Sequence, residues 1–289
     1  MKPLVLYHNN CADGFTAAWC AANSLAECEL YGATHGNNPP SLRGRLVYML
    51  DFSYKQPTMD ILADEAEAIV VLDHHKSAEA ELAHLNRSNV KCIFDMNKSG
   101  ARLAWEFFCQ TKPNDTPWLV KFVEDHDLGR WGYNETRDVM SAVFSYEYSM
   151  QNWDMLHSVC ESEVRLQRLV AEGSAISRKQ SKDISELLQV FQVSDNIGGY
   201  VVPVANLPYT FSTEAGRLMS LGHAFAACWY ATRNGIEYSL RSQAGAVDVS
   251  EIAKIYGGGG HARAAGFRIP HGKTLLDYPI PAPLTPRNS

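Results

Sequence analysis

The sequence lacks any apolar run of the roughly 20 residues that a membrane-spanning helix needs. Near the N-terminus, Asn9, Asn10 and Asp13 interrupt anything that could serve as the apolar core of a signal peptide. The seven cysteines are scattered and none has CxxC spacing, which argues against a zinc ribbon and against a disulfide framework. We therefore expect a soluble, cytoplasmic protein that does not associate with membranes.

Positive charge is also scarce. Lys and Arg number 26 against 32 Asp and Glu, for a net charge of −6, which does not suggest a protein that coats long nucleic acid by bulk charge. A local positive site is still allowed, especially where metal ions supply the charge. The length of 289 residues, 46% of them hydrophobic, suits one large folded domain or two moderate ones. The oligomeric state is left open, and a homodimer is compatible with the sequence.

The first half of the chain alternates short apolar strands with helices. This alternation predicts an α/β fold with a mainly parallel sheet that helices cover on both faces. The strands are expected at Leu4–Tyr7, Cys28–Tyr31, Leu46–Leu50, Ala68–Leu72 and Lys91–Phe94. The helices are expected at Phe15–Ser24, Thr58–Ala66, Ala78–Leu85, Gly100–Cys109 and Trp118–Glu124, with Ser99 as the cap of the fourth.

The pattern changes after the first half. Apolar residues from Asp154 to Val193 recur at helical spacing, which predicts a long amphipathic connecting helix that Gly173 breaks or kinks. A smaller α/β unit follows, with strands at Tyr200–Ala205, Ala226–Thr232 and Ile236–Arg241 and a helix at Thr213–Leu221. We expect a catalytic domain over residues 1–150, a helical linker over 151–195, a substrate-binding domain over 196–270 and a proline-rich tail over 271–289.

Several of the predicted strands end in side chains that can bind metals. The run Val70-Val71-Leu72 leads directly into Asp73, His74 and His75, and the strand that begins at Leu46 leads into Asp51. The first strand leads into His8 and, shortly after, Asp13-Gly14. Because parallel sheets bind ligands at the carboxyl ends of their strands, these carboxylates and imidazoles are expected to converge.

Taken in order, these motifs resemble those of the DHH phosphoesterase superfamily over residues 4–268. That superfamily includes RecJ-type single-strand exonucleases, nanoRNases, cyclic-dinucleotide phosphodiesterases and family II inorganic pyrophosphatases. The C-terminal half resembles the DHH-associated substrate-binding domain in the segments Ser239–Ser242, Asp248–Ser250 and Gly257–Phe267.

The resemblance implies two divalent ions, typically Mn²⁺, with Mg²⁺ or another divalent ion as alternatives. Such a pair supplies hydroxide and offsets phosphoryl charge, with a carboxylate as the bridge. The implied metal ligands are His8, Asp13, Asp51, Asp73, His74 and Asp125. Of these, Asp51 is the candidate bridge and Asp73 also a candidate catalytic residue. His75 would contact the phosphate or protonate the leaving oxygen, as a histidine can near pH 7.

Two ligand positions stay open in the sequence. Asp125 is preferred over Asp127 as the ligand that follows the fifth helix, but either carboxylate could instead cap the turn. RecJ-type enzymes carry Asp-x-Asp-Gly in the first motif, and Cys11 stands where their first Asp belongs. Cys11 is either a ligand, softer than Asp and better suited to zinc or iron, or a small buried residue with no ligand role.

The glycine run that ends in His261 is expected to contact substrate. Glycines let backbone N–H groups approach an anion closely, so Gly258, Gly259, Gly260 and His261 are candidate substrate-binding residues, with Arg241 as a phosphate fork.

A small second domain over the metal site favours short substrates. The sequence therefore predicts a metal-dependent phosphodiesterase, of exonuclease type, for short single-stranded oligonucleotides or related small nucleotides. The alternatives are a phosphoesterase for cyclic dinucleotides or 3′-phosphoadenosine phosphate, and a nucleotide-binding protein in which Cys11 impairs one metal site.

Overall fold

The computed structural model describes residues 2–109 and 115–279 of the chain. The chain divides into two compact units, Met1–Ser177 and Arg178–Ser289. The division falls inside one long helix, α8 (Glu163–Phe191). Each unit has its own sheet and its own hydrophobic core.

The first unit is built on a five-stranded sheet in which every neighbouring pair is parallel. Its strands, in spatial order, are β2 (Glu29–Ala33), β1 (Leu4–His8), β3 (Leu46–Leu50), β4 (Ala68–Asp73) and β5 (Val90–Phe94). The alternation of short apolar strands and helices predicted this parallel sheet, and the prediction is confirmed. All five strands point the same way, so their carboxyl ends lie along one edge.

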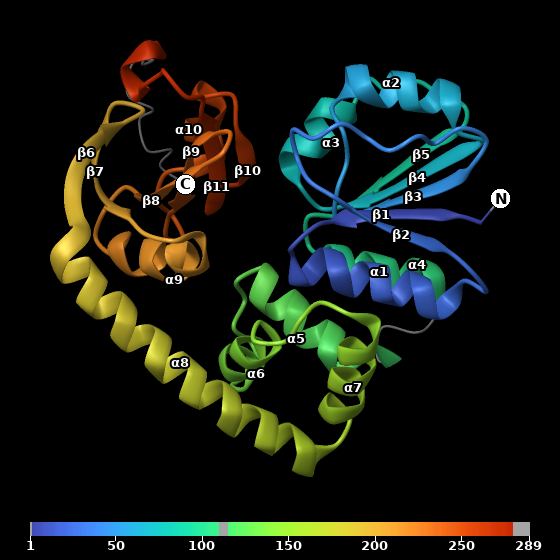
Figure 1. The fold of residues 1–289 in the computed structure, drawn as a ribbon, viewed down its shortest axis with the longest axis horizontal. Helices are drawn as coiled ribbons and strands as arrows, with labels where there is room; N and C mark the ends of the chain where they lie inside the picture. Colours follow the sequence, from blue (N-terminus) through green and yellow to red (C-terminus); the bar gives the residue numbers. More distant parts are fainter. Residues whose placement is uncertain (1, 110–114, 280–289) are drawn as a thin grey trace. The chain divides into compact units, whose positions relative to one another are not determined.

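Helices cover both faces of this sheet (Figure 1). One face carries α1 (Ala12–Ser24) and α4 (Gly100–Cys109), and the other carries α2 (Gln56–Glu65) and α3 (Lys76–Leu82). Along β1, Val5 belongs to the core on the first face, whereas Leu4 and Leu6 belong to the core on the second. Because successive side chains of a strand point to opposite faces, strands that are apolar throughout require helices on both sides.

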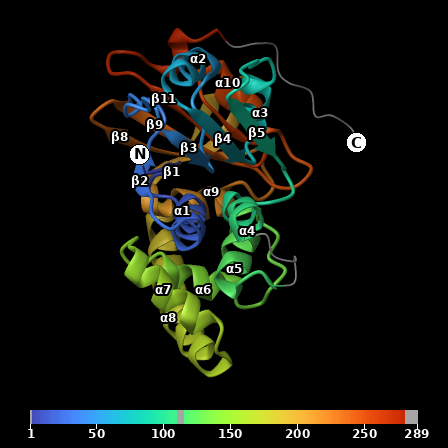
Figure 2. The same ribbon diagram turned by 90° about the vertical axis from the view of Figure 1, so that its right-hand side faces the viewer.

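Three further helices extend the first unit beside α1 and α4 (Figures 1 and 2). They are α5 (Trp118–Asp127), α6 (Thr136–Val143) and α7 (Met150–Cys160). Trp153 of α7 is fully buried, and its Nε1 donates a hydrogen bond to Thr16 Oγ1 at 2.8 Å. This bond fixes α7 against α1, the helix that begins beside the carboxyl end of β1.

The segment predicted as one long helix is two helices, α7 and α8, separated by Glu161 and Ser162. Gly173 does not break α8, which runs through it without interruption. A Cβ added at Gly173 would lie 1.7 Å from the carbonyl oxygen of Asp138 in α6. The glycine is therefore needed for the close approach of α8 to α6, and not to end a helix.

The second unit has a six-stranded mixed sheet. In spatial order the strands are β10 (Gly259–His261), β11 (Ala264–Ile269), β9 (Gly235–Arg241), β8 (Ala226–Thr232), β7 (Tyr200–Asn206) and β6 (Gln192–Ile197). The predicted strands β7, β8 and β9 are confirmed, and α9 (Tyr209–Met219) and α10 (Val249–Ile255) accompany them. Strands β6, β10 and β11 were not predicted, since β6 is polar and exposed and β10 is mostly glycine.

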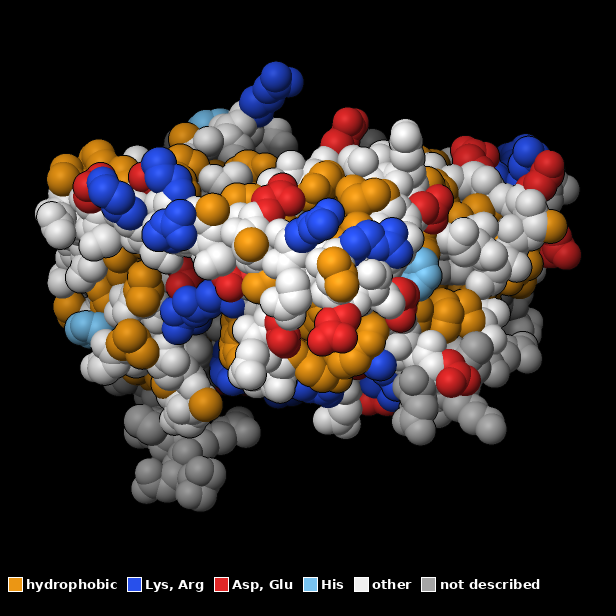
Figure 3. Space-filling view, turned by 90° about the horizontal axis from the view of Figure 1, so that it is seen from below, with side chains coloured by type: hydrophobic (Ala, Val, Ile, Leu, Met, Phe, Trp, Pro, Cys, Tyr) orange, Lys and Arg blue, Asp and Glu red, His pale blue; other side chains and the backbone are white. Residues whose placement is uncertain are grey.

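The tail that was expected after residue 270 begins with a short 3-10 helix, Leu275–Asp277. Residues 280–289 of that expected tail lie outside the described residues. Within the described ranges, no helix combines the length and the apolar character that crossing a bilayer would require. In the space-filling view, basic and acidic side chains are interspersed over the visible face (Figure 3).

Candidate metal centre at the strand ends

Three strands of the parallel sheet deliver metal-binding side chains to its carboxyl edge. His8 is the last residue of β1, Asp51 directly follows β3, and Asp73 is the last residue of β4. Asp51 has a left-handed backbone with φ of 53°, a conformation that Asp tolerates better than most residues. This turn of the backbone directs the Asp51 carboxylate into the cluster rather than along the strand.

The buried carboxylate of Asp51 stands between two groups of potential ligands. Its Oδ1 lies 3.1 Å from His74 Nε2. Its Oδ2 lies 3.5 Å from His8 Nδ1 and 3.6 Å from Cys11 Sγ. Each oxygen of Asp51 therefore faces a separate set of donors, which is the arrangement that a carboxylate needs to bridge two ions.

The first group consists of Asp13, Asp51 and His74, whose ligand atoms lie within 4.8 Å of one another. His74 Nε2 is 3.6 Å from Asp13 Oδ2 and 3.5 Å from Asp127 Oδ2. Asp13, Asp51 and His74 are almost fully buried, whereas the Asp127 side chain is 27% exposed. Asp127 thus lies at the rim of this first group.

The N-terminus of α4 holds Asp13 in place. Gly100 N donates a hydrogen bond to Asp13 Oδ2 at 2.6 Å, and Ala101 N donates one to Asp13 Oδ1 at 2.9 Å. Backbone donors at a helix N-terminus stabilise a negative charge. Ser99 Oγ accepts a hydrogen bond from Arg102 N at 3.2 Å, which confirms Ser99 as a cap of this helix.

The second group consists of His8, Cys11 and Asp51, and its ligand atoms also lie within 4.8 Å of one another. Cys11 directly precedes α1 and occupies its N-cap position. The group therefore combines one imidazole, one thiol and one carboxylate.

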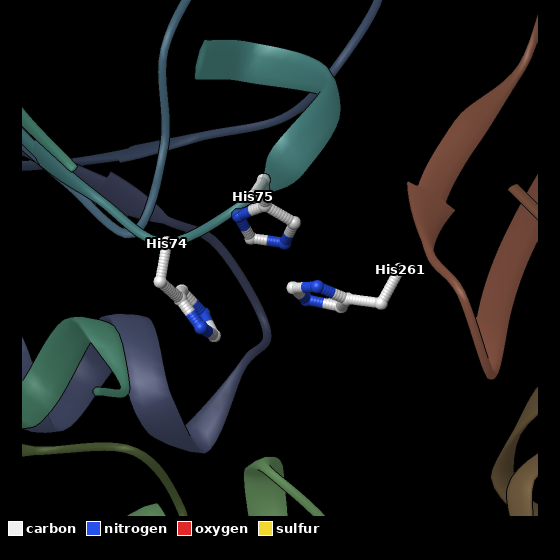
Figure 4. A group of neighbouring side chains, drawn as sticks. All are labelled: His74, His75 and His261. Carbon is white, nitrogen blue, oxygen red and sulfur yellow. The ribbon is translucent and has the colours of Figure 1, made fainter. Parts of the chain in front are cut away.

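Asp73 orients His75. Asp73 Oδ1 lies 2.6 Å from His75 Nδ1 and also accepts hydrogen bonds from the backbone N–H groups of His74 at 2.7 Å and His75 at 3.2 Å. Figure 4 shows His74 where β4 ends and His75 where α3 begins. The three contacts to one oxygen fix the strand-to-helix turn and the ring of His75. Asp73 also belongs to a compact group with Asp51 and His75.

Asp125 and Asp127 have different surroundings in the structure, and Asp127, not the preferred Asp125, lies beside the first group. The buried carboxylate of Asp125 accepts hydrogen bonds from Gly132 N at 2.8 Å and from Thr136 Oγ1. It therefore organises the loop between α5 and α6. Asp127 is the carboxylate that reaches His74, because it lies on a different side of α5 from Asp125.

The electrostatics of the first group call for a cation. Burial, followed by the charges of Asp51 and Asp127, raises the pKa of Asp13, and burial also raises the pKa of Asp127. Burial opposes the charged form of His74, but its hydrogen bond to Asp51 and nearby carboxylates outweigh burial and raise its pKa to about 10. For His75, burial is likewise outweighed, chiefly by Asp73, and its pKa rises to about 9.

These shifts mean that the protein alone balances its buried carboxylates with protons. Carboxylate oxygens and imidazole nitrogens are the donors that Mn²⁺, Mg²⁺ and Zn²⁺ accept in proteins. The residues therefore fit divalent ions, which would provide the missing positive charge.

In the second unit, Arg241 and His261 are in register across the sheet, one strand to either side of β11. Both pair with Ala264 of β11, Arg241 from β9 and His261 from β10, so their side chains share a face at a separation of about 10 Å. The Arg241 guanidinium donates to Ser239 Oγ at 3.0 Å and Thr213 Oγ1 at 2.8 Å. Among the described residues, no carboxylate forms an ion pair with Arg241, and burial lowers its pKa.

The last two glycines before His261, Gly259 and Gly260, belong to the edge strand β10, and Gly257 lies in the turn before it. A Cβ added at Gly258 would lie 2.1 Å from Gly266 O, and one added at Gly260 would lie 2.6 Å from Ala264 O. Close packing of this edge against β11 therefore explains both glycines without a ligand. Contact of Gly258, Gly259 and Gly260 with substrate stays a proposal.

No family model matches the chain. Over 300 residues it is 28% identical to the uncharacterized protein R106 of Acanthamoeba polyphaga mimivirus, covering 95% of this chain and 69% of that protein.

Solved structures share the fold at low sequence identity. The DHH domain of a member of the s1p family of ribosomal proteins aligns with a TM-score of 0.60 and 13% identity, over 96% of this chain and 85% of that one. The chain has the fold of the DHH superfamily. RecJ from Thermus thermophilus in complex with Mn²⁺ aligns with a TM-score of 0.51 and 13% identity, over 93% of this chain and 49% of RecJ. An exopolyphosphatase-related protein from Bacteroides fragilis aligns with a TM-score of 0.51 and 14% identity, over 96% and 89% of the two chains.

One residue beside the candidate metal centre, His35, was not identified from the sequence. The ring of His35 packs against Phe52, with centroids 4.5 Å apart, and against His8 at 5.4 Å. His35 follows β2, so the rule that identified the other strand-end residues would also have found it. The signal was weaker because His35 stands two residues beyond the strand, in a polar loop.

Proposed function

We propose that this chain is a divalent-metal-dependent phosphodiesterase that hydrolyses phosphoester bonds in short single-stranded oligonucleotides or related small nucleotides. The observation that carries the proposal is the carboxylate of Asp51, whose two oxygens face two separate donor groups. Two ions that share one carboxylate are typical of phosphoryl-transfer sites. The RecJ neighbour, whose structure contains Mn²⁺, supports manganese as the ion.

Asp13, Asp51, His74 and Asp127 would hold one ion, with Asp127 in the place first given to Asp125. His8 and Asp51 would contribute to the other. When bound, the ion pair supplies hydroxide near neutral pH and offsets the charge of the phosphoryl oxygens. The α4 N-terminus keeps Asp13 oriented toward the first position.

His75 is the proposed proton donor. Its Nδ1 contacts Asp73 Oδ1, and this contact stabilises the imidazolium form, whose pKa is raised to about 9. His75 would therefore carry a proton at neutral pH and pass it from Nε2 to the leaving oxygen. Asp73 would act as the residue that positions and charges His75, in addition to its proposed place near the ions.

The second unit would hold the substrate. Arg241 lacks a carboxylate partner among the described residues, and the three hydrogen bonds that it donates, to Ser239 Oγ, Leu240 O and Thr213 Oγ1, fix the plane of the guanidinium. A fixed guanidinium is suited to bidentate contact with a phosphate. His261 and the backbone of Gly258, Gly259 and Gly260 would contribute further contacts on the same sheet.

The test is Mn²⁺-dependent release of mononucleotides from a labelled dinucleotide and from a long oligonucleotide. We expect fast turnover of the dinucleotide and a loss of about 10²–10⁴-fold in kcat for His75→Ala, the range for removal of a general acid. His84→Ala, an exposed histidine on the same unit, is the matched control and should keep full activity. Absence of turnover on both substrates by folded, Mn²⁺-loaded wild type would overturn the proposal.

A further inference from the structure

Cys11 provides the donor that distinguishes the second group from the first. Its Sγ lies 3.6 Å from Asp51 Oδ2, the same oxygen that lies 3.5 Å from His8 Nδ1. The three ligand atoms lie within 4.8 Å of one another. An imidazole, a thiol and a carboxylate oxygen thus converge on one point beside the first group, which contains only oxygen and nitrogen donors.

Helix capping does not explain Cys11. The residue occupies the N-cap of α1, yet its side chain forms no capping hydrogen bond. Ser, Thr, Asp and Asn are the residues that stabilise this position. The thiol instead contacts a buried carboxylate, a poor environment for a side chain whose only role is apolar packing.

We propose that the Cys11 thiolate, His8 and Asp51 hold a softer divalent ion, such as Zn²⁺ or Co²⁺, beside a harder ion at Asp13, Asp51, His74 and Asp127. This inference rests on the proposed two-ion centre and makes its two positions chemically different. Thiolates select softer ions, whereas carboxylate and imidazole sets accept Mn²⁺ and Mg²⁺. The centre is therefore a mixed pair, with Asp51 as the shared ligand.

Cobalt provides a direct spectroscopic test. Addition of Co²⁺ to metal-free protein should produce a thiolate-to-cobalt charge-transfer band in the near ultraviolet. The intensity of this band should reach a plateau that corresponds to one thiolate-bound Co²⁺ per chain. Cys11→Ser should abolish the band, and Cys28→Ser, which alters a half-buried cysteine away from the site, should retain it. A band that persists in Cys11→Ser, or no band in wild type, would overturn the assignment.

Cys11→Asp provides a second variant that keeps a charged ligand at this position. In competition between Zn²⁺ and excess Mn²⁺, wild type should retain one Zn²⁺ per chain, and Cys11→Asp should lower this preference at least tenfold. An equal preference in both proteins would overturn the proposal. Circular dichroism of both variants establishes that they are folded.

Failure of this inference can be told apart from failure of the proposed function. Dinucleotide hydrolysis by wild type without any thiolate band would reject Cys11 as ligand and leave the phosphodiesterase proposal standing. A thiolate band in a protein without hydrolytic activity would support Cys11 as ligand and reject the phosphodiesterase proposal.

Discussion

At the scale of single residues, the site depends on which oxygen or nitrogen atom each side chain presents. Asp51 faces both donor groups because its left-handed backbone, with φ of 53°, turns the carboxylate into the cluster. The strand ends predicted that Asp51, Asp73 and His74 converge. The structure places Asp127, and not the preferred Asp125, beside His74. Two residues in one helical turn point in different directions, and only the packing of α5 decides which faces the site.

The roles of these two aspartates can be separated by substitution. Asp125→Asn should lower the free energy of unfolding by about 1–3 kcal/mol, because a buried acceptor of loop hydrogen bonds is weakened. Asp127→Asn should leave stability nearly unchanged and weaken binding of Mn²⁺. Denaturant unfolding and calorimetric Mn²⁺ titration measure the two effects. Equal metal affinity in wild type and Asp127→Asn would reject Asp127 as a ligand.

Protons and metal ions should compete for the first group. His74, with a pKa raised to about 10, is protonated at pH 7, and Asp13 also has a raised pKa. A ligand must give up its proton to bind metal, so binding should release protons and affinity should rise with pH. The rise is about tenfold per pH unit for each proton released. Mn²⁺ titrations in buffers of different ionisation enthalpy measure this release, and heats independent of the buffer would reject it.

At the scale of helices and strands, the sequence predicted the strands that contain apolar runs and missed the strand that is polar. The five parallel strands were found because each is a short segment with apolar residues, and four of them, β1, β3, β4 and β5, are followed by a helix. Strand β6 escaped notice because Gln192–Ile197 is polar and lies exposed at a sheet edge. Gly173 was misread as a helix breaker, since a glycine needed for close helix packing has the same sequence signature as one that ends a helix.

The packing role of Gly173 predicts a stability defect. In an open helix, Gly→Ala stabilises by up to about 1 kcal/mol. Here Gly173→Ala should destabilise by about 1–3 kcal/mol, because the new methyl group collides with the carbonyl oxygen of Asp138 and forces α8 away from α6. Thermal unfolding measures the change, with Gln167→Ala at an exposed position of α8 as the control. A stabilised Gly173→Ala would show that α6 and α8 are not packed in this way.

At the scale of the whole molecule, the two units have separate cores and separate proposed roles, metal binding in the first and substrate binding in the second. The first unit gathers negative carboxylates that need divalent ions, and the second presents Arg241 and His261 on one sheet face. The small excess of negative charge over the chain fits a protein whose affinity for phosphate comes from a few fixed groups and bound ions. The sequence named Arg241 and His261 as candidate substrate-binding residues, but that they share one sheet face could not be derived from it, because this depends on strand pairing between β9, β10 and β11.

The most direct measurement is the number of divalent ions held per chain, determined by elemental analysis after equilibration with Mn²⁺ and Zn²⁺. We expect two ions in wild type and a loss of at least one in Asp51→Asn, since one carboxylate serves both positions. Asn tolerates the left-handed backbone at this position, so the variant tests the charge and not the fold. A single ion in wild type, or two ions retained in Asp51→Asn, would rule out a centre bridged by Asp51.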